Sequence, residues 1–182
     1  MLLKYGCATL RAIEPKDSTL LLNMMNDPEI EISTVGEHAP VSENQQNQWA
    51  SGYKNDDCNI RLMIELTNGK TIGMISLTSI DYKNGTAHTG FKIGCPLEDR
   101  MKHDTFDACA ALYLYAFQYL RLNCIEGLTL EDNTFSLNLQ KRLGFQVEGV
   151  LRERVFKNGE YRNLVSTSLL KRNFLEKINK KG

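Results

Sequence analysis

The sequence predicts an α/β fold in which helices flank a mixed, mostly antiparallel sheet of about six to seven strands. Two Asn-Gly pairs, Asn68-Gly69 and Asn158-Gly159, predict hairpins in the two halves of the chain. The longest amphipathic run, roughly residues 104 to 122, lies between two strand-like segments and predicts a helical crossover between central strands. No shift in composition divides the chain, so we expect a single domain over residues 1–182.

The first half of the chain predicts a strand, two helices and three antiparallel strands. A helix beginning near Asp17 or Ser18 is expected to end before Pro28, and Ser42 is expected to begin a polar helix. Between the two helices, turn residues predict a loop. The expected elements are a strand within residues 7–15, helices at 16–27 and 42–53, a loop at 28–40, and strands at 59–66, 71–80 and 87–95.

The second half predicts helix, strand, helix and a final hairpin. Apolar residues from Phe106 to Leu120 recur at three- and four-residue spacing, which is typical of a helix face that packs on a core. The strands are expected at 124–130, 145–156 and 161–170, with a short helix beginning near Thr134. The basic tail 171–181 is expected to be a solvated end.

Composition excludes several classes of protein. The formal charge is zero and no dense basic stripe precedes the tail, which argues against a nucleic-acid binder. No apolar run has membrane-spanning length, and the N-terminal residues have no signal-peptide core. The five cysteines form no C-x-x-C pair, and the three histidines form no metal-ligand cluster with them. A reduced, cytoplasmic protein without a metal is therefore expected.

Local charge is uneven. Residues 17 to 53 contain six acidic residues and no Lys or Arg, whereas all 22 basic residues lie elsewhere. A solvated helix face would explain part of this bias. The functional alternative is an acidic wall that raises the local concentration of a cationic ligand. Its candidate binding residues are Glu29, Glu31 and Glu37.

Two short segments are candidates for chemistry. Arg100, Lys102 and His103 precede the long helix, whose N-terminal N–H groups and dipole would suit a phosphate. The alternative is a surface loop in which Asp104 caps that helix. In the second segment, Asn133 follows a strand and opens a helix, so it either caps that helix or faces a ligand together with Ser136.

These residues resemble a known family. The stretch from "GFKIGCPLEDRMKHDT" through "LEDNTFSLNLQKRLGFQVEG" is similar to the acyl-CoA core of the GNAT acetyltransferase superfamily. "LRAIEPKD" and "NGKTIGMISL" resemble its early elements, so the likeness covers most of the chain. "RLGFQVEGVLRERVFKNGEYRNLV" is closest in appearance to spermidine N-acetyltransferases and ribosomal-protein N-terminal acetyltransferases.

The resemblance implies a GNAT fold with a central, splayed pair of parallel strands. It also implies that acetyl-CoA donates an acetyl group directly to a primary amine, with the pantetheine arm beside the first strand and the pyrophosphate on the following loop. The residues that it implies for the donor are Phe91, Ile93, Gly94, Arg100, Met101, Lys102, His103, Asp104, Thr105, Asn133 and Ser136. The implied catalytic positions are Glu131, Ser136 and Gln140, and Glu98 and Glu37 are further candidates for the base.

Two features, at three positions, depart from the family pattern. Met101 and His103 stand where related enzymes usually place glycines. Gln140 stands where many members have a tyrosine that protonates the leaving thiolate, and an amide cannot donate a proton in that way. The prediction is an N-acetyltransferase for a small amine, with a polyamine favoured over a protein N-terminus or an amino-sugar, and homo-oligomerisation is left open. A non-catalytic acyl-CoA or polyamine sensor of the same fold is the alternative.

Overall fold

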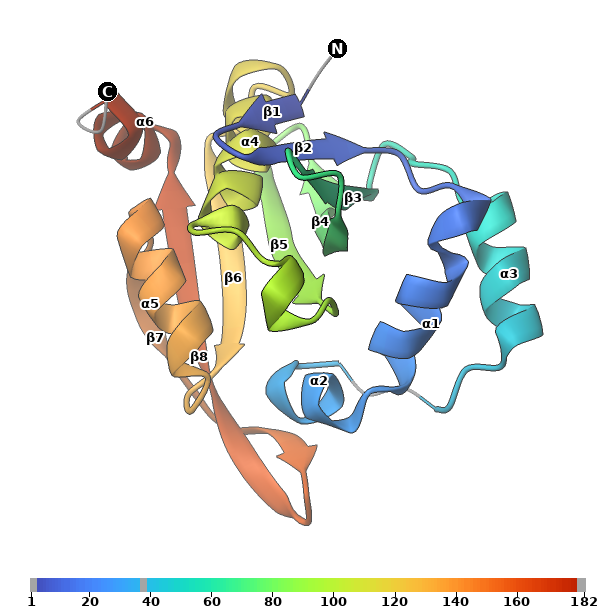
Figure 1. The fold of residues 1–182 in the computed structure, drawn as a ribbon. Helices are drawn as coiled ribbons and strands as arrows, with labels where there is room; N and C mark the ends of the chain where they lie inside the picture. The colour runs from blue at the N-terminus through green and yellow to red at the C-terminus, as the bar shows by residue number, and fades with distance from the viewer. Residues whose placement is uncertain (1–2, 37–38, 180–182) are drawn as a thin grey trace.

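The computed structural model describes residues 3–36 and 39–179 of the chain. An eight-stranded sheet forms its centre, with the order β1-β2-β3-β4-β5-β6-β8-β7 (Figure 1). The strands are β1 (Leu3–Tyr5), β2 (Ala8–Arg11), β3 (Ile60–Leu66), β4 (Thr71–Asp81), β5 (Thr86–Ile93), β6 (Cys124–Leu130), β7 (Gln146–Lys157) and β8 (Glu160–Leu170). Neighbouring strands are antiparallel except β5 and β6, which are parallel, as the sequence predicts.

Helices lie around this sheet. The α-helices are α1 (Ser18–Asn26), α2 (Pro28–Ser33), α3 (Glu43–Gly52), α4 (Asp104–Gln118), α5 (Thr134–Leu143) and α6 (Lys171–Asn179), and short 3-10 turns are η1 (Pro15–Asp17) and η2 (Leu97–Asp99). In Figure 1, α5 lies beside the β7–β8 hairpin, and α1, α2 and α3 gather at the other side of the molecule. None of the helices in the described ranges is long and apolar enough to cross a membrane.

The predicted amphipathic helix forms the centre of the core. Leu112, Ala116 and Phe117 of α4 are fully buried, and burying such side chains supplies most of the stabilisation of a domain. The ring of Phe174 lies 5.6 Å from that of Phe117 and 5.9 Å from that of Tyr113. Helix α4 ends at Gln118, four residues before the predicted limit at 122.

One predicted loop is a helix. Residues 28–33 form α2, because Pro28 suits the first turn of a helix and the Asp27 carboxylate caps it. The Asp27 oxygen accepts hydrogen bonds from the backbone N–H of Glu29 at 2.8 Å and of Ile30 at 3.4 Å. Pro28 therefore separates two helices, whereas the sequence interpretation took it only as the end of the first.

Both ends of the chain also differ from the prediction. Residues 3–5 add strand β1, paired with β2 through the turn at Gly6, so the sheet has eight strands instead of six or seven. The tail expected to be solvated forms α6, whose Phe174 is fully buried. Its charged residues suggested a solvated segment, but one aromatic residue on the inner face is enough to anchor it.

Candidate functional site

The central parallel strands separate partway along their length. β5 and β6 are matched at three residue pairs only, ending at His88 and Glu126. Beyond His88, β5 continues to Ile93 in register with β4 on its other side. Figure 1 shows the two strands diverging towards α2. The β6-facing edge of β5 from 89 to 93 can therefore hydrogen-bond to an extended ligand that contains amides.

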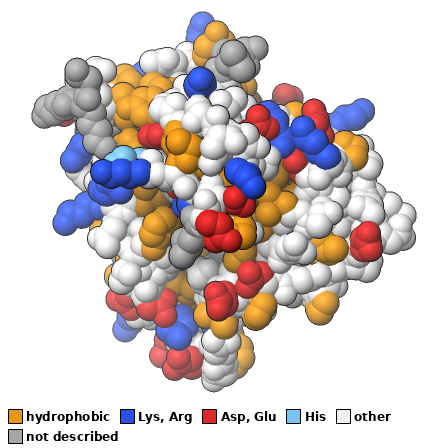
Figure 2. Space-filling view, in the orientation of Figure 1, with side chains coloured by type: hydrophobic (Ala, Val, Ile, Leu, Met, Phe, Trp, Pro, Cys, Tyr) orange, Lys and Arg blue, Asp and Glu red, His pale blue; other side chains and the backbone are white. Residues whose placement is uncertain are grey.

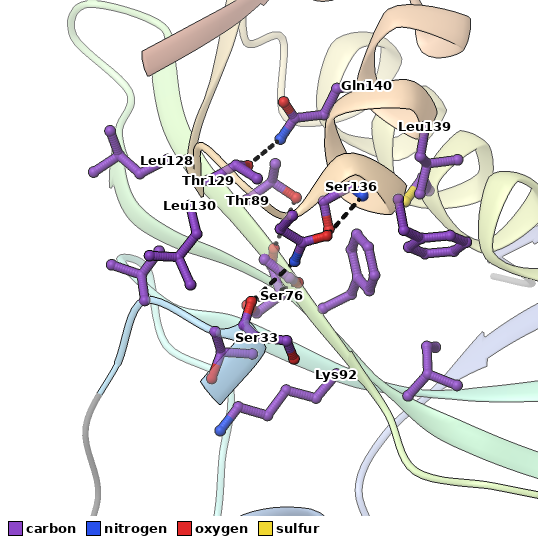
Figure 3. Close-up of a pocket in the computed structure, with 18 of the residues that line it drawn as sticks. Ser33, Ser76, Thr89, Lys92, Leu128, Thr129, Leu130, Ser136, Leu139 and Gln140 are labelled. Carbon is purple, nitrogen blue, oxygen red and sulfur yellow. Dashed lines mark hydrogen bonds between the residues drawn. The ribbon is translucent and has the colours of Figure 1, made fainter. Parts of the chain in front are cut away.

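A pocket of about 590 Å³ occupies this split. Its walls come from β4, β5, β6, α2, α4 and α5. Figure 3 shows Ser33 and Lys92 towards one end, and Leu139 and Gln140 towards the other. The predicted site residues that line it are Phe91, Ile93, Arg100, Asn133, Ser136 and Gln140.

Asn133 performs two structural roles at the pocket wall. Its Oδ1 accepts a hydrogen bond from the Ser136 backbone N–H at 3.0 Å, which caps α5. Its Nδ2 donates to the carbonyl oxygen of Ser33, the last residue of α2, at 2.9 Å (Figure 3). The capping alternative thus describes part of its role, and the same side chain also fixes α2 beside the split.

The three predicted catalytic residues do not converge. Ser136 lines the pocket. Gln140 is 9% exposed, and its amide donates to Thr129 Oγ1 at 3.0 Å and accepts from Thr167 Oγ1 at 3.1 Å. The side chain of Gln140 therefore holds α5 against β6, through the Thr129 bond that Figure 3 shows, and against β8 through Thr167. Glu131 is exposed, bonds to Asn163 at 2.9 Å and lies outside the pocket lining.

An internal carboxylate occupies the start of α4. Asp104, 3% exposed, accepts hydrogen bonds from Arg100 Nη2 at 2.6 Å, from Met101 N–H at 3.2 Å and from the backbone N–H of Thr105. Burial would raise the pKa of Asp104, but the hydrogen bonds from Arg100 and Thr105 lower it below its ordinary value. Arg100 and the backbone N–H groups of Met101 and Thr105, which were predicted to meet a phosphate, thus bind the Asp104 carboxylate in this structure.

Most of the predicted loop residues border a second pocket of about 320 Å³. His103 adopts φ +69°, a left-handed conformation that glycine would adopt without strain, and this agrees with the family pattern. Its Nδ1 lies 3.2 Å from Arg142 Nη2 of α5. Met101 lines the same pocket, while Lys102 is exposed and absent from its lining.

Gly94, which was predicted to bind the donor, lies outside the lining of the large pocket, close to the Met24 side chain. Its N–H donates to the carbonyl oxygen of Ile72 at 3.0 Å. A Cβ atom at this position would lie 2.1 Å from Met24 Cγ, so a larger residue would require the Met24 side chain of α1 to move.

The acidic segment has basic partners from elsewhere in the chain. Asp17 is 4% exposed and accepts two hydrogen bonds of 2.8 Å from Arg11. Glu31 Oε1 lies 2.6 Å from Nζ of Lys157, at the end of β7. Figure 2 likewise shows basic and acidic side chains interspersed on one face of the molecule. The premise of an acidic wall without cations is therefore wrong for these two carboxylates.

Lys157 binds the segment around α2 at three points. Besides the Glu31 carboxylate, its ammonium donates to the carbonyl oxygens of Glu31 at 3.1 Å and Gly36 at 2.8 Å. It is only 6% exposed, which is unusual for a lysine unless its charge is compensated. Glu29 is exposed on α2, and Glu37 lies outside the described residues.

Sequence reasoning missed several residues of the site. His88 and Lys92 line the pocket from β5, and Tyr113 lines it from α4. Burial lowers the pKa of Lys92, while Glu31 opposes that effect and Lys157 adds to it. The two-residue period of the strand at 87–95 could have placed residues 88 and 92 on one face. Nothing local in the sequence indicates that Lys157 reaches α2.

Comparisons with known proteins agree with this geometry. Residues 8–146 match the family model described as an acetyltransferase (GNAT) domain. YdaF of Bacillus subtilis, named for a proposed ribosomal N-acetyltransferase activity, is 31% identical over 174 residues, which cover 90% of this chain and 91% of YdaF. Spermidine N(1)-acetyltransferase of Vibrio cholerae is 26% identical over 169 residues, covering 93% and 96%.

A solved structure of a spermidine acetyltransferase has the same fold as this chain. The crystal structure of spermidine N-acetyltransferase from Vibrio cholerae, in complex with CoA and spermine, superposes with a TM-score of 0.82 and 25% identity. The match covers 92% of this chain and 98% of the other. The split parallel strands and the pocket between them thus occur in a fold that binds CoA.

Proposed function

Because this chain belongs to the GNAT acetyltransferase family, we propose that its acceptor is a primary amine with little further positive charge. Acetyl-CoA is the acyl donor, and an amine receives the acetyl group. A peptide N-terminus or a monoamine with an apolar body belongs to the proposed class of acceptor.

The residues at the split fit an acyl-CoA donor. The open edge of β5 near Phe91 and Ile93 offers backbone groups to the amides of a pantetheine arm, and Asn133 and Ser136 line the adjoining wall. Because Asp104 takes the hydrogen bonds at the start of α4, the phosphates would meet His103 and Arg142 at the second pocket. When bound, the donor supplies a thioester that an amine can attack.

The ion pair between Glu31 and Lys157 is the observation that supports this class of acceptor. Lys157 neutralises the Glu31 carboxylate, which lies on α2 beside the pocket. Without Lys157, that carboxylate could form an ion pair with a second positive charge on the acceptor. The pocket beside α2 is mostly apolar. Its hydrophobic residues are Ile30 of α2, Val35 of the segment after α2, Met74 of β4, and Leu128 and Leu130 of β6.

A polyamine is the second candidate, and the likeness to the spermidine acetyltransferase of Vibrio cholerae favours it. Glu29 is exposed on α2 and could attract such a cation. Exposed pairs contribute at most about 1 kcal/mol each and are screened by salt. A polyamine held by exposed carboxylates should therefore bind much more weakly at high ionic strength.

Thiol release from acetyl-CoA distinguishes the two candidates. We would compare spermidine, a monoamine without any further charged group, and short peptides with a free N-terminus, each at low and high ionic strength. The proposal predicts the higher kcat/KM for a monoamine or peptide, with little dependence on salt. A clear preference for spermidine that falls steeply with salt would support the polyamine instead, and no thiol release with any amine would contradict both.

A further inference from the structure

Amine acetylation needs a group that accepts a proton, because an alkyl amine with a pKa near ~10 is mostly an ammonium at neutral pH. Among the described residues that line the large pocket, none is Asp or Glu. Glu131 bonds to Asn163 outside the lining, and Glu98 also lies outside it. In the described part of the pocket, none of the carboxylates suggested by the sequence is therefore placed to accept the proton of the amine.

The other ionisable side chains of the lining are poor proton acceptors. Arg100 remains charged and binds Asp104. Burial raises the pKa of Cys109 to about 12 and the pKa of Tyr113 well above its usual value, so both stay protonated near neutral pH. Burial lowers the pKa of Lys92, but Glu31 opposes that shift, and an ordinary lysine side chain is a cation near neutral pH. Among the described residues of the lining, His88 is the remaining ionisable side chain.

His88 lies where the split begins. It forms the last matched pair of β5 with β6, opposite Glu126, and the next residue of β5 has left that pairing. Its Nε2 is 3.5 Å from Glu126 Oε2, and the two side chains are 44% and 45% exposed. A neutral imidazole can accept a proton as a general base, and the adjacent Glu126 carboxylate is placed to orient the ring.

We propose that His88 is the general base for the proposed acetyl transfer, with Glu126 as its positioning partner. Neutral His88 takes one proton from the acceptor ammonium, so the amine lone pair becomes free. The new N–C bond then forms as the C–S bond breaks, and the electron pair of the C–S bond leaves with the CoA sulfur. A second proton passes from the nitrogen to that thiolate, so the products are the amide and the CoA thiol. Because His88 is half-exposed, its proton can pass to water and restore the neutral imidazole.

The surroundings of His88 contain few other charges. Across the sheet its neighbours are Thr78 of β4 and Glu126 of β6, and the next residue on β8 is Ser168. Glu148 of β7 binds the Ser168 hydroxyl and is the next carboxylate in that direction. Lys92 lies four residues along β5 and is the nearest pocket cation on the same strand. Glu126 is thus the charged group that faces the imidazole directly.

The test compares His88→Gln and Glu126→Gln with the exposed control Lys83→Gln, using an alkyl amine and an amine that is already neutral at pH 7. General-base catalysis is worth about 10²-fold or more, so His88→Gln should lower kcat/KM for the alkyl amine by about that factor. The loss should be much smaller for the neutral amine, and the Kd of acetyl-CoA should not change. Glu126→Gln should show a smaller loss in the same direction, and Lys83→Gln none.

Two results would overturn the role of His88 as a general base. One is an equal loss of kcat/KM on both amines, which would show that His88 is structural, and the other is full activity of His88→Gln on the alkyl amine. If His88→Gln does not fold, the Glu126→Gln variant provides the same comparison between amines. Because the inference rests on acetyl transfer to an amine, an inactive unmodified protein would instead contradict the proposed function.

Discussion

Replacing Lys157 by Met removes the ammonium that holds the segment around α2. The substitution keeps a long apolar stem but deletes the bonds to Glu31 Oε1, to the Glu31 carbonyl and to the Gly36 carbonyl. Glu31 would then be left with a carboxylate whose Oε2 has no hydrogen-bond partner in the described structure. The α2 wall of the pocket would keep its Asn133 bond and lose its bonds to the β7–β8 hairpin.

The expected magnitude follows from burial. Removing one partner of a fully buried ion pair costs about 3–5 kcal/mol. Glu31 is 29% exposed, so water can partly solvate the orphaned carboxylate, and we expect a loss of roughly 2 kcal/mol in the free energy of unfolding. The double variant Glu31→Gln/Lys157→Met should be more stable than Lys157→Met alone, because no unpaired charge remains.

Denaturation and steady-state kinetics provide the assay. If Lys157 positions the acceptor wall, KM for the amine should rise by about tenfold, while kcat and the Kd of acetyl-CoA change little. Lys54→Met, at an exposed lysine outside the pocket lining, is the control. A loss of stability without any change in acceptor KM would show that α2 does not shape the acceptor site.

The described contacts give four further expected outcomes. Asn133→Ala should cost about 1 kcal/mol of stability through the lost cap, and any larger kinetic loss, measured alongside the melting curve, would indicate a role at the site. His103→Gly should remove the strain of the left-handed backbone conformation and raise the Tm. If the variant also binds acetyl-CoA more weakly, the imidazole itself contributes to donor binding. Because the pKa of Asp104 is lowered in the folded protein, its carboxylate stabilises the fold above about pH 4, and this contribution is lost as the pH falls through the folded-state pKa. In Asp104→Asn the free energy of unfolding should therefore depend less on pH in the acid range. A thiol reagent at pH 8 should label exposed Cys58 quickly and buried Cys109, with a pKa of about 12, only after unfolding; mass spectrometry would identify the sites.

Local patterns were enough to predict much of the fold. The Asn-Gly turns identified the β3–β4 and β7–β8 hairpins, and the apolar stripe identified α4. Helix α2 was missed because Pro28 is compatible both with the end of one helix and with the start of the next. Helix α6 was missed because a single buried residue, Phe174, outweighs its charged neighbours.

The site was less predictable, because its important contacts join distant parts of the chain. Lys157 and Glu31 are 126 residues apart, so the sequence displayed an acidic segment without the cation that neutralises it. Asp104 was correctly considered as a residue of the α4 start. Only the fold shows its carboxylate bonded to Arg100 and to the backbone of that turn. His88 was passed over because it has no ligand-spaced partner in sequence, whereas Glu126 is its neighbour across the sheet.

The short pairing between β5 and β6 also has a consequence for how the chain unfolds. Only three residue pairs join the sheet formed by β1 to β5 with that formed by β6 to β8, and α4 bridges both halves from the core. Because few hydrogen bonds join the two halves, we expect either half to open by local unfolding while the other stays folded. A donor lying in the split would contact both halves, so its binding should suppress the separate opening of each. Hydrogen exchange with and without acetyl-CoA would then show protection spreading across the whole sheet and not only at the residues in contact.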